Sequence, residues 1–235
     1  MDALALLAAE PQQAALFFDV DGVLAAIVPR PDDAVVPAAT RRELERLAGR
    51  YGLVACVTGR PAEQARELVG VEGIRYAGEH GLELDPAAAA FAGQIAAFAD
   101  RIDWPDVERK PLSAAFHYRA AADRDAARIA LEAVAREALL EELRPRWGRL
   151  VLEVLPPVTA SKGTAVLALL AESGLRRALY AGDDTTDLDG FAALDGLEAS
   201  VRIAVVSEEG PAELGARADL IVGSPASLLE LMQRL

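Results

Sequence analysis

Residues 14–24, AALFFDVDGVL, are the segment of the sequence that is most informative about the fold. A run of five apolar residues, 14–18, is followed at once by two aspartates and a glycine. A short apolar run without alternation is typical of a strand in a parallel sheet that helices cover on both faces. Open parallel sheets bind ligands beyond the carboxyl ends of their strands. The stretch therefore predicts an α/β protein with an acidic group where a ligand site is expected.

Short apolar runs and longer amphipathic segments alternate on either side of this stretch. We expect further strands at 53–57, 74–77, 178–181, 201–206 and 220–222. We expect helices at 37–50, 61–69, 161–173, 186–194 and 224–235. This alternation is typical of βαβ units. It predicts a doubly wound parallel-sheet core.

The middle of the chain has a different pattern. Residues 107–119, VERKPLSAAFHYR, alternate as paired antiparallel strands do, and a further strand is expected at 150–155. Helices are expected at 87–102 and 120–143. We therefore predict an inserted α+β cap domain at residues 84–155. The catalytic core would then consist of residues 1–83 and 156–235.

The composition excludes several classes of protein. The chain has 235 residues, of which 52% are hydrophobic, so it is not intrinsically disordered. Its 24 basic and 37 acidic residues give a net charge of −13, which opposes binding to nucleic acids or anionic membranes. The single cysteine, Cys56, lies in an apolar run and is expected to be an inert core residue. With no signal or membrane-spanning pattern, we expect a cytoplasmic monomer.

Lysine and histidine are rare, so their positions are informative. Only two of the 24 basic residues are lysines, Lys110 and Lys162, and the only histidines are His80 and His117. Biased codon usage is the alternative explanation. Ser161 is a good N-cap, which would place Lys162 in the first turn of a helix. A cation there opposes the helix dipole at a cost of roughly 0.3–1 kcal/mol, so its position favours a role in neutralising phosphate.

Two acidic motifs follow predicted strands. Asp19 and Asp21 are two residues apart in an extended segment, so we expect their carboxylates to lie side by side. The segment GDDTTD at 182–187 adds Asp183, Asp184 and Asp187, more carboxylates than helix capping needs. Turn chemistry and capping are the respective alternatives. A shared divalent cation such as Mg²⁺ would relieve the repulsion among these groups.

A third motif, Thr58-Gly59-Arg60, follows the strand at 53–57 and precedes a helix that Pro61 opens. A hydroxyl and backbone N–H groups at a helix N-terminus can bind an anion. Threonine is also an ordinary N-cap, so this motif alone does not decide between the two roles.

Taken together, these motifs resemble those of the haloacid-dehalogenase-like phosphohydrolases. The segments LFFDVDGVL, TGR, GEHG, VERK, HYR, LEVLPP before SKG, and GDDTTD are similar to those of the trehalose-6-phosphate phosphatases, over about residues 14–222. The resemblance implies a phosphatase that uses Mg²⁺ to hydrolyse trehalose 6-phosphate through an aspartyl-phosphate. It implies these catalytic residues: Asp19 as nucleophile, Asp21 as general acid and base, and Thr58 and Lys162 as phosphate ligands. It places the metal at Asp19, the carbonyl of Asp21 and Asp183, with Asp184 and Asp187 nearby.

The resemblance also implies that the cap recognises the sugar. The expected substrate-binding residues are Gly59, Arg60, His80, Glu108, Lys110, His117, Arg119 and Glu153. Charged residues also alternate on any solvated sheet face, which is the alternative for those in the cap.

Three positions depart from the pattern of these phosphatases: Val23, Leu155 and Leu188. Threonine, arginine and an acidic residue, respectively, are the residues expected there. Other readings stay open on the sequence alone. They are a phosphatase of another sugar phosphate, such as a mannosyl- or glucosyl-phosphoglycerate, a sugar-phosphate mutase, and a non-catalytic sugar-phosphate sensor.

Overall fold

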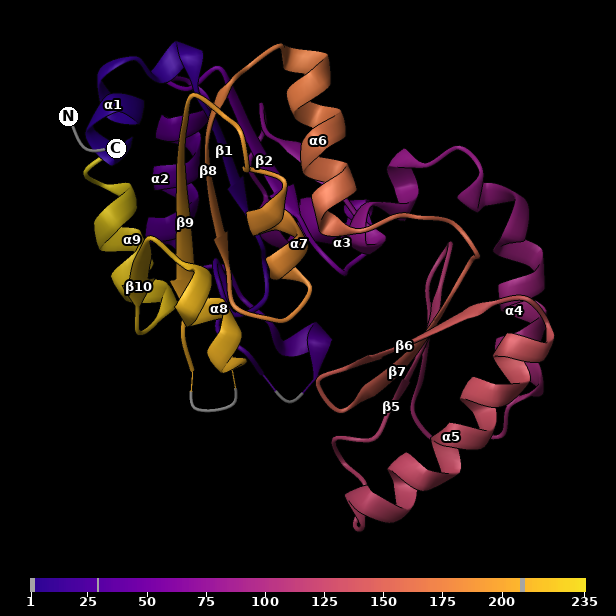
Figure 1. Ribbon diagram of the computed structural model, residues 1–235. Helices are drawn as coiled ribbons and strands as arrows, with labels where there is room; N and C mark the ends of the chain where they lie inside the picture. The colour runs from indigo at the N-terminus through magenta and orange to yellow at the C-terminus, as the bar shows by residue number, and fades with distance from the viewer. Residues whose placement is uncertain (1–2, 29, 208–209) are drawn as a thin grey trace. The chain divides into compact units, whose positions relative to one another are not determined.

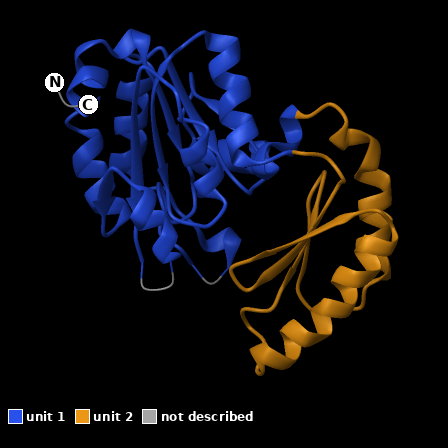
Figure 2. Ribbon diagram, viewed as in Figure 1, with its two compact units in different colours: residues 1–84, 160–235 blue, residues 85–159 orange. Residues whose placement is uncertain are grey.

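The computed structural model describes residues 3–28, 30–207 and 210–235. The chain forms two compact units (Figure 2). Unit 1 comprises residues Met1–Leu84 and Ala160–Leu235, and unit 2 comprises Asp85–Thr159. Unit 2 is therefore an insertion in the sequence of unit 1.

Unit 1 is built on a six-stranded sheet in the order β10-β9-β8-β1-β2-β3 (Figure 1). The strands are β1 (Ala15–Phe18), β2 (Leu53–Val57), β3 (Arg75–Ala77), β8 (Arg177–Gly182), β9 (Ala199–Val205) and β10 (Leu220–Val222). Each pair of neighbours is parallel. The chain winds in opposite directions from β1, toward β2 on one side and β8 on the other, which makes the β1–β8 boundary the topological switch point. The predicted doubly wound core is confirmed.

Helices cover both faces of this sheet because successive side chains of each strand point to opposite faces. Leu16 and Phe18 belong to the hydrophobic cluster on one face, and Ala15 and Phe17 to the cluster on the other. The first face is covered by α1 (Ala3–Ala9), α2 (Ala38–Ala48), α3 (Ala62–Val69) and α9 (Pro225–Met232). The second is covered by α6 (Lys162–Ser173), α7 (Asp187–Ala192) and α8 (Ala212–Arg217). Among the described residues, no helix is both long enough and apolar enough to cross a membrane.

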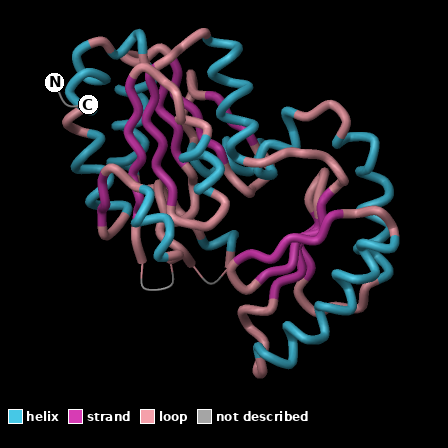
Figure 3. Tube along the Cα trace, viewed as in Figure 1, coloured by secondary structure: helices cyan, strands magenta, loops and turns pink. Residues whose placement is uncertain are grey.

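Unit 2 contains a four-stranded antiparallel sheet in the order β4-β5-β7-β6, which Figure 3 shows with its helices. The strands are β4 (Val107–Arg109), β5 (Ala114–His117), β6 (Arg144–Gly148) and β7 (Val151–Leu155). The helices α4 (Ala92–Arg101) and α5 (Arg124–Leu140) share one hydrophobic cluster with the sheet. The predicted antiparallel α+β module is therefore present.

Short 3₁₀ segments complete the fold, at Pro11–Gln13, Pro31–Asp33, Glu79–Leu84 and Ala88–Phe91. Strand β6 and helices α1 and α8 were not predicted. The segment RPRWG of β6 has no apolar alternation and contains a proline, and α1 and α8 are too short for a helical period to be evident. Cys56 is buried within β2, as predicted, and burial raises the pKa of its thiol.

Candidate functional site

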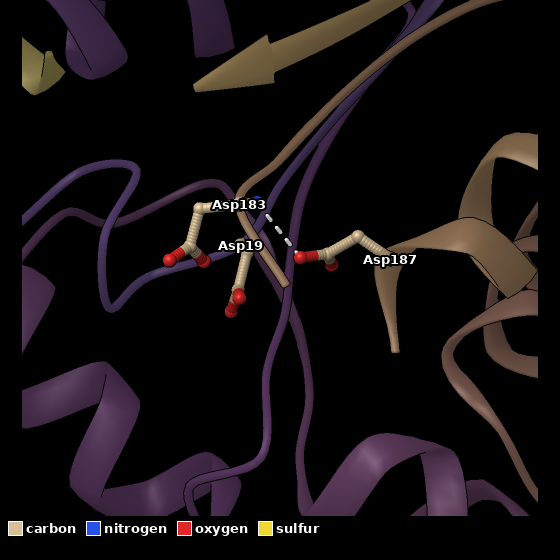
Figure 4. Close-up of side chains that lie close together, drawn as sticks. All are labelled: Asp19, Asp183 and Asp187. Carbon is tan, nitrogen blue, oxygen red and sulfur yellow. Dashed lines mark hydrogen bonds between the residues drawn. The ribbon is translucent and has the colours of Figure 1, made fainter. Parts of the chain in front are cut away.

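Three buried carboxylates meet at the carboxyl ends of β1 and β8 (Figure 4). Asp19 directly follows β1, Asp183 directly follows β8, and Asp187 opens α7. One oxygen atom from each lies within 4.8 Å of the others. The backbone N–H of Asp19 donates to the carbonyl of Ala181 at 3.0 Å, so the pairing of β1 with β8 continues to the site. The acidic cluster therefore lies at the carboxyl ends of the strands, where the sequence predicts an acidic group, and at the topological switch point of the sheet.

The ammonium of Lys162 holds two of these carboxylates. It is 2% exposed and donates to Asp19 Oδ2 and to Asp187 Oδ1, each at 2.7 Å. Ser161 caps α6 as predicted, in a capping box with Thr164. Burial lowers the pKa of Lys162, but Asp187 and Asp19 raise it more, to a value well above its usual range. Two anionic partners thus outweigh the unfavourable helix dipole at this position.

The cluster carries an excess of negative charge. Burial raises the pKa of Asp19 to about 7, although Lys162 opposes this shift. Burial, together with the charges of Asp19 and Asp187, raises the pKa of Asp183 to about 8. Lys162 supplies one positive charge to three carboxylates. An all-oxygen, anionic donor set of this kind fits a hard divalent cation such as Mg²⁺.

The carboxylate of Asp187 is engaged on both oxygens. Its Oδ1 accepts from Lys162 and from the hydroxyl of Tyr180, each at 2.7 Å, and its Oδ2 accepts the backbone N–H groups of Asp183 and Asp184 at 2.9 Å. Figure 4 draws the bond from Asp183. Four donors fix this carboxylate, which is one of the three that could hold a metal ion together with Asp19 and Asp183. Asp187 therefore also positions Lys162 and the backbone after β8, and its role as a metal ligand stays a prediction.

The carboxylates of the other two predicted metal ligands in these motifs, Asp184 and Asp21, have partners of their own. Oδ1 of Asp184 accepts from the N–H of Thr185 at 2.8 Å. Asp21 forms a bidentate pair with Arg60, whose Nε and terminal nitrogen donate to its two oxygens at 2.6 and 2.7 Å. The carboxylates of Asp19 and Asp21 thus have different cationic partners, and a metal held by Asp19 and the carbonyl of Asp21 stays a prediction. Lys162 neutralises the first, and Arg60 neutralises the second.

Glycines create the space that the acidic cluster needs. Gly22 has φ of +81°, and a Cβ at this position would lie 2.2 Å from Oδ2 of Asp183. A Cβ on Gly182 would lie 2.3 Å from the Cβ of Asp187. Any larger residue would displace one of the two aspartates, so both glycines are part of the site's geometry.

The TGR and GEHG segments form two joined loops beside the cluster. Thr58 is fully buried at the end of β2; its Oγ1 accepts from the N–H of Arg60 at 3.2 Å, and its carbonyl accepts from the N–H of His80 at 2.8 Å. A Cβ on Gly59 would lie 2.5 Å from Nε2 of His80, so the ring packs directly on the glycine. Glu79 and His80 have φ values of +46° and +56°, a strained conformation that often marks functional loops. Arg60, predicted to bind substrate, is bonded in this structure to Asp21 and to the carbonyl of Pro31.

Unit 2 carries a second polar cluster on its sheet. The ammonium of Lys110 lies 3.8 Å from a carboxylate oxygen of Glu108 and 3.8 Å from one of Glu153. The side chains of Lys110 and Glu153 are each only 8% exposed. The strand register aligns Glu108, Ala115 and Glu153 across neighbouring strands, on the face opposite the buried Phe116. The charged side chains therefore form a cluster that the strand register brings together, rather than a set of separate, solvated charges.

Two further residues extend this cluster. His117 Nε2 lies 3.1 Å from Glu108 Oε2. Arg146 donates from two nitrogens to Glu153 Oε2, at 2.9 and 2.7 Å. Arg146 was not predicted, because the sequence of β6 does not indicate a strand. Only the pairing of β6 with β7, which places Arg146 opposite Glu153, reveals that it belongs to the cluster. Arg119, the last residue of the segment predicted to alternate, lies in the turn after β5 and not in the strand.

The three departures from the resemblance are apolar residues with packing roles. Val23 is fully buried in the core, and Leu155 is 1% exposed. Leu188 is partly buried against the cluster that contains Tyr180 and Phe191.

Comparisons with known proteins agree with this architecture. A family model described as trehalose-phosphatase matches residues 17–218. The trehalose-phosphate phosphatase of Mycobacterium avium (strain 104) is 35% identical over 242 residues, which cover 94% of this chain and 61% of the relative. The trehalose-phosphate phosphatase of Mycobacterium ulcerans (strain Agy99) is also 35% identical, with the same coverage. The chain thus spans about three fifths of the length of these curated relatives.

A solved structure supports the fold. The C-terminal domain of trehalose-6-phosphate phosphatase from C. albicans superposes with a TM-score of 0.74 at 21% identity, covering 100% of this chain and 96% of that one. Sequence and fold together therefore place the chain in the trehalose-phosphatase family.

Proposed function

We propose that this protein hydrolyses trehalose 6-phosphate to trehalose and inorganic phosphate. The observation that carries the proposal is the buried pair of Asp19 and Lys162 beside Asp183, at the sheet's switch point in a chain of this family. A carboxylate nucleophile, a cation and further acidic residues are the groups that phosphoryl transfer needs.

In the proposed mechanism, a carboxylate oxygen of Asp19 attacks phosphorus and the bond from phosphorus to the sugar oxygen breaks. Asp21 gives its proton to that oxygen, and trehalose leaves. Asp21 then takes a proton from water, whose oxygen attacks phosphorus. The bond from phosphorus to the Asp19 oxygen breaks, which releases phosphate and restores the Asp19 carboxylate. Since both oxygens of Asp21 accept from Arg60 in this structure, Asp21 has to leave that pair and take up a proton from solvent before it can protonate the leaving oxygen.

Charge stabilisation dominates such a reaction, because uncatalysed phosphate-ester hydrolysis is extremely slow. The ammonium of Lys162 would attract the phosphoryl oxygens, and the loop from Thr58 would offer its hydroxyl and backbone N–H groups. Mg²⁺, held by Asp19 and Asp183, would supply further positive charge to the same oxygens.

The first prediction tests the substrate. With Mg²⁺ present, we expect trehalose 6-phosphate to release phosphate faster than glucose 6-phosphate and glucosyl-phosphoglycerate do, measured as inorganic phosphate over time. Cleavage of another ester in preference would assign a different sugar phosphate. Phosphate that moves between hydroxyls without release would identify a mutase, and binding without turnover would identify a sensor.

The second prediction concerns metal and pH. The raised pKa values of Asp19 and Asp183, about 7 and about 8, mean that the metal-free folded protein holds protons that the unfolded chain loses near pH 4. The contribution of this site to stability therefore falls as pH rises from about 4 to 8. Because Mg²⁺ competes with these protons, it should raise the melting temperature more at about pH 8.5 than at about pH 6.

Thermal unfolding with Mg²⁺ or with a chelator measures this difference. Asp183→Asn should remove most of the Mg²⁺ response, whereas Asp32→Asn, an exposed residue of a 3₁₀ segment, should keep it. Equal stabilisation by Mg²⁺ at both pH values would contradict the assignment of these aspartates as ligands.

We further propose that unit 2 recognises the sugar through Glu108, Lys110 and Glu153. These side chains combine donors and acceptors, which sugar hydroxyls need, and the low exposure of Lys110 and Glu153 limits competition from water. Arg146 and His117 would hold the two glutamates in place.

The third prediction follows. Glu153→Gln should raise KM for trehalose 6-phosphate by about 10-fold or more, since a lost bond to a charged group costs about 1.5–3 kcal/mol. Hydrolysis of p-nitrophenyl phosphate, which has no sugar, should stay within about twofold. Arg109→Gln is the matched control, because Arg109 pairs with Asp100 and is about half exposed. Equal loss on both substrates would place Glu153 in the structure of the unit rather than in sugar recognition.

A further inference from the structure

Tyr180 is a buried aromatic residue whose hydroxyl donates a hydrogen bond to a buried carboxylate, that of Asp187. It lies on β8, is fully buried, and packs edge-to-face on Phe191 with ring centroids 5.9 Å apart. A Cβ on Gly190 would lie 2.4 Å from the ring, so the ring is also in contact with that backbone. The ring is thus confined on several sides, and its hydroxyl has a fixed position.

This hydroxyl begins a chain of short hydrogen bonds that ends at the proposed nucleophile. Tyr180 donates to Asp187 Oδ1, the same oxygen accepts from Lys162, and Lys162 donates onward to Asp19. All three distances are 2.7 Å. Tyr180 is therefore two side chains away from Asp19.

The two oxygens of Asp187 are fixed by different parts of the chain. Oδ2 is held by the backbone N–H groups of Asp183 and Asp184, and Oδ1 by the side chains of Tyr180 and Lys162. Lys162 has a long, flexible stem, whereas the Tyr180 ring is packed in place. The rigid donor is therefore the one that sets where Oδ1 lies, and Oδ1 in turn limits where the ammonium lies.

Two other tyrosines donate their hydroxyl hydrogen bonds to groups that have no link to Lys162. Tyr51 donates to the carbonyl of Leu235 at 3.3 Å, and Tyr76 to the carbonyl of Val71 at 3.1 Å. Both acceptors are main-chain oxygens outside the acidic cluster. Tyr180 instead donates to a carboxylate that also binds the active-site lysine.

We propose that Tyr180 is a positioning residue for the reaction: its hydroxyl fixes Asp187 and thereby aligns the Lys162 ammonium with Asp19. The effect on rate rests on the proposed phosphatase function, whereas the effect on Lys162 does not. Tyr180 does not touch the substrate in this proposal.

The first test is kinetic. Tyr180→Phe removes one oxygen atom and keeps the ring, so we expect kcat for trehalose 6-phosphate to fall about 10-fold, with KM within about twofold. Tyr51→Phe, the matched control, should leave both constants within about twofold. An unchanged kcat in Tyr180→Phe, or an equal loss in the two variants, would overturn the proposal.

The second test needs no catalysis. The chain has only two lysines, so protein labelled with ¹⁵N-lysine gives side-chain signals from Lys110 and Lys162 alone, and Lys110→Arg assigns them. We expect Tyr180→Phe to shift the Lys162 ammonium resonance and leave that of Lys110 in place, and Tyr51→Phe to shift neither. A Lys162 resonance that does not move would refute the positioning role.

These two tests separate the two proposals. If the wild-type protein releases phosphate from no ester, the proposed phosphatase function is refuted. The Lys162 resonance would still decide whether Tyr180 positions Lys162. If Tyr180→Phe does not fold, Phe191→Leu loosens the ring without touching its hydroxyl. It should then shift the Lys162 resonance, and an unchanged resonance would again count against the proposal.

Discussion

Asp19→Asn is expected to lower the rate of phosphate release from trehalose 6-phosphate by a factor on the order of 10⁴–10⁶, the size of effect seen when an enzyme loses its nucleophile. The amide cannot form the aspartyl-phosphate, and it carries no charge to pair with Lys162 or to hold a cation. The measurement is inorganic phosphate release at saturating substrate and Mg²⁺.

Stability distinguishes this loss of chemistry from misfolding. Because burial raises the pKa of Asp19 to about 7, its charged form is costly in the folded protein, and the neutral amide avoids that cost above neutral pH. The variant should therefore melt at a temperature close to that of the wild type, and Asp32→Asn should keep activity within about twofold. Full activity in Asp19→Asn would mean that another group attacks phosphorus.

Lys162→Met is expected to affect both stability and rate. It leaves the buried carboxylates of Asp19 and Asp187 without the ammonium that pairs with them, and breaking a buried ion pair in this way costs about 3–5 kcal/mol. Loss of one donor to the reacting phosphoryl group should lower kcat by about 10²–10³-fold. Urea unfolding and phosphate release measure the two effects.

The matched control is an exposed ion pair. Arg217 pairs with Glu213 one turn away on α8, and its side chain is 56% exposed, so Arg217→Gln should cost less than about 1 kcal/mol. Mg²⁺ should restore part of the stability of Lys162→Met, because it also neutralises the cluster. A Lys162→Met protein as stable as Arg217→Gln would show that the buried carboxylates are protonated and need no cation.

Much of the core could be predicted because its signals are local. The run at 14–18 is apolar at every position, and its alternate side chains, such as Leu16 and Phe17, pack on opposite faces of the sheet. Parallel strands end at the same edge of a sheet. The motifs that begin at Asp19 and Asp183 each follow such a strand, so they were expected to meet at that edge. The N-cap at Ser161 likewise follows from a few neighbouring residues.

The partners of the charged groups could not be predicted because they depend on tertiary contacts. Arg60 is 39 residues from Asp21, and nothing in either motif indicates that the guanidinium reaches that carboxylate. Tyr180 resembles any apolar residue of a buried strand until the position of Asp187 is known. Arg146 belongs to β6, a strand whose sequence has neither the alternation nor the β-branched residues on which strand prediction depends.

The distribution of basic residues has a consequence for chemical modification. The chain has two lysines, and their side chains are 8% and 2% exposed, at Lys110 and Lys162. All its other basic side chains are guanidinium groups, which do not react with reagents that acylate amines. Amine acylation of a lysine in this protein therefore reports the opening of a polar cluster, one in each unit, and not the reactivity of the surface.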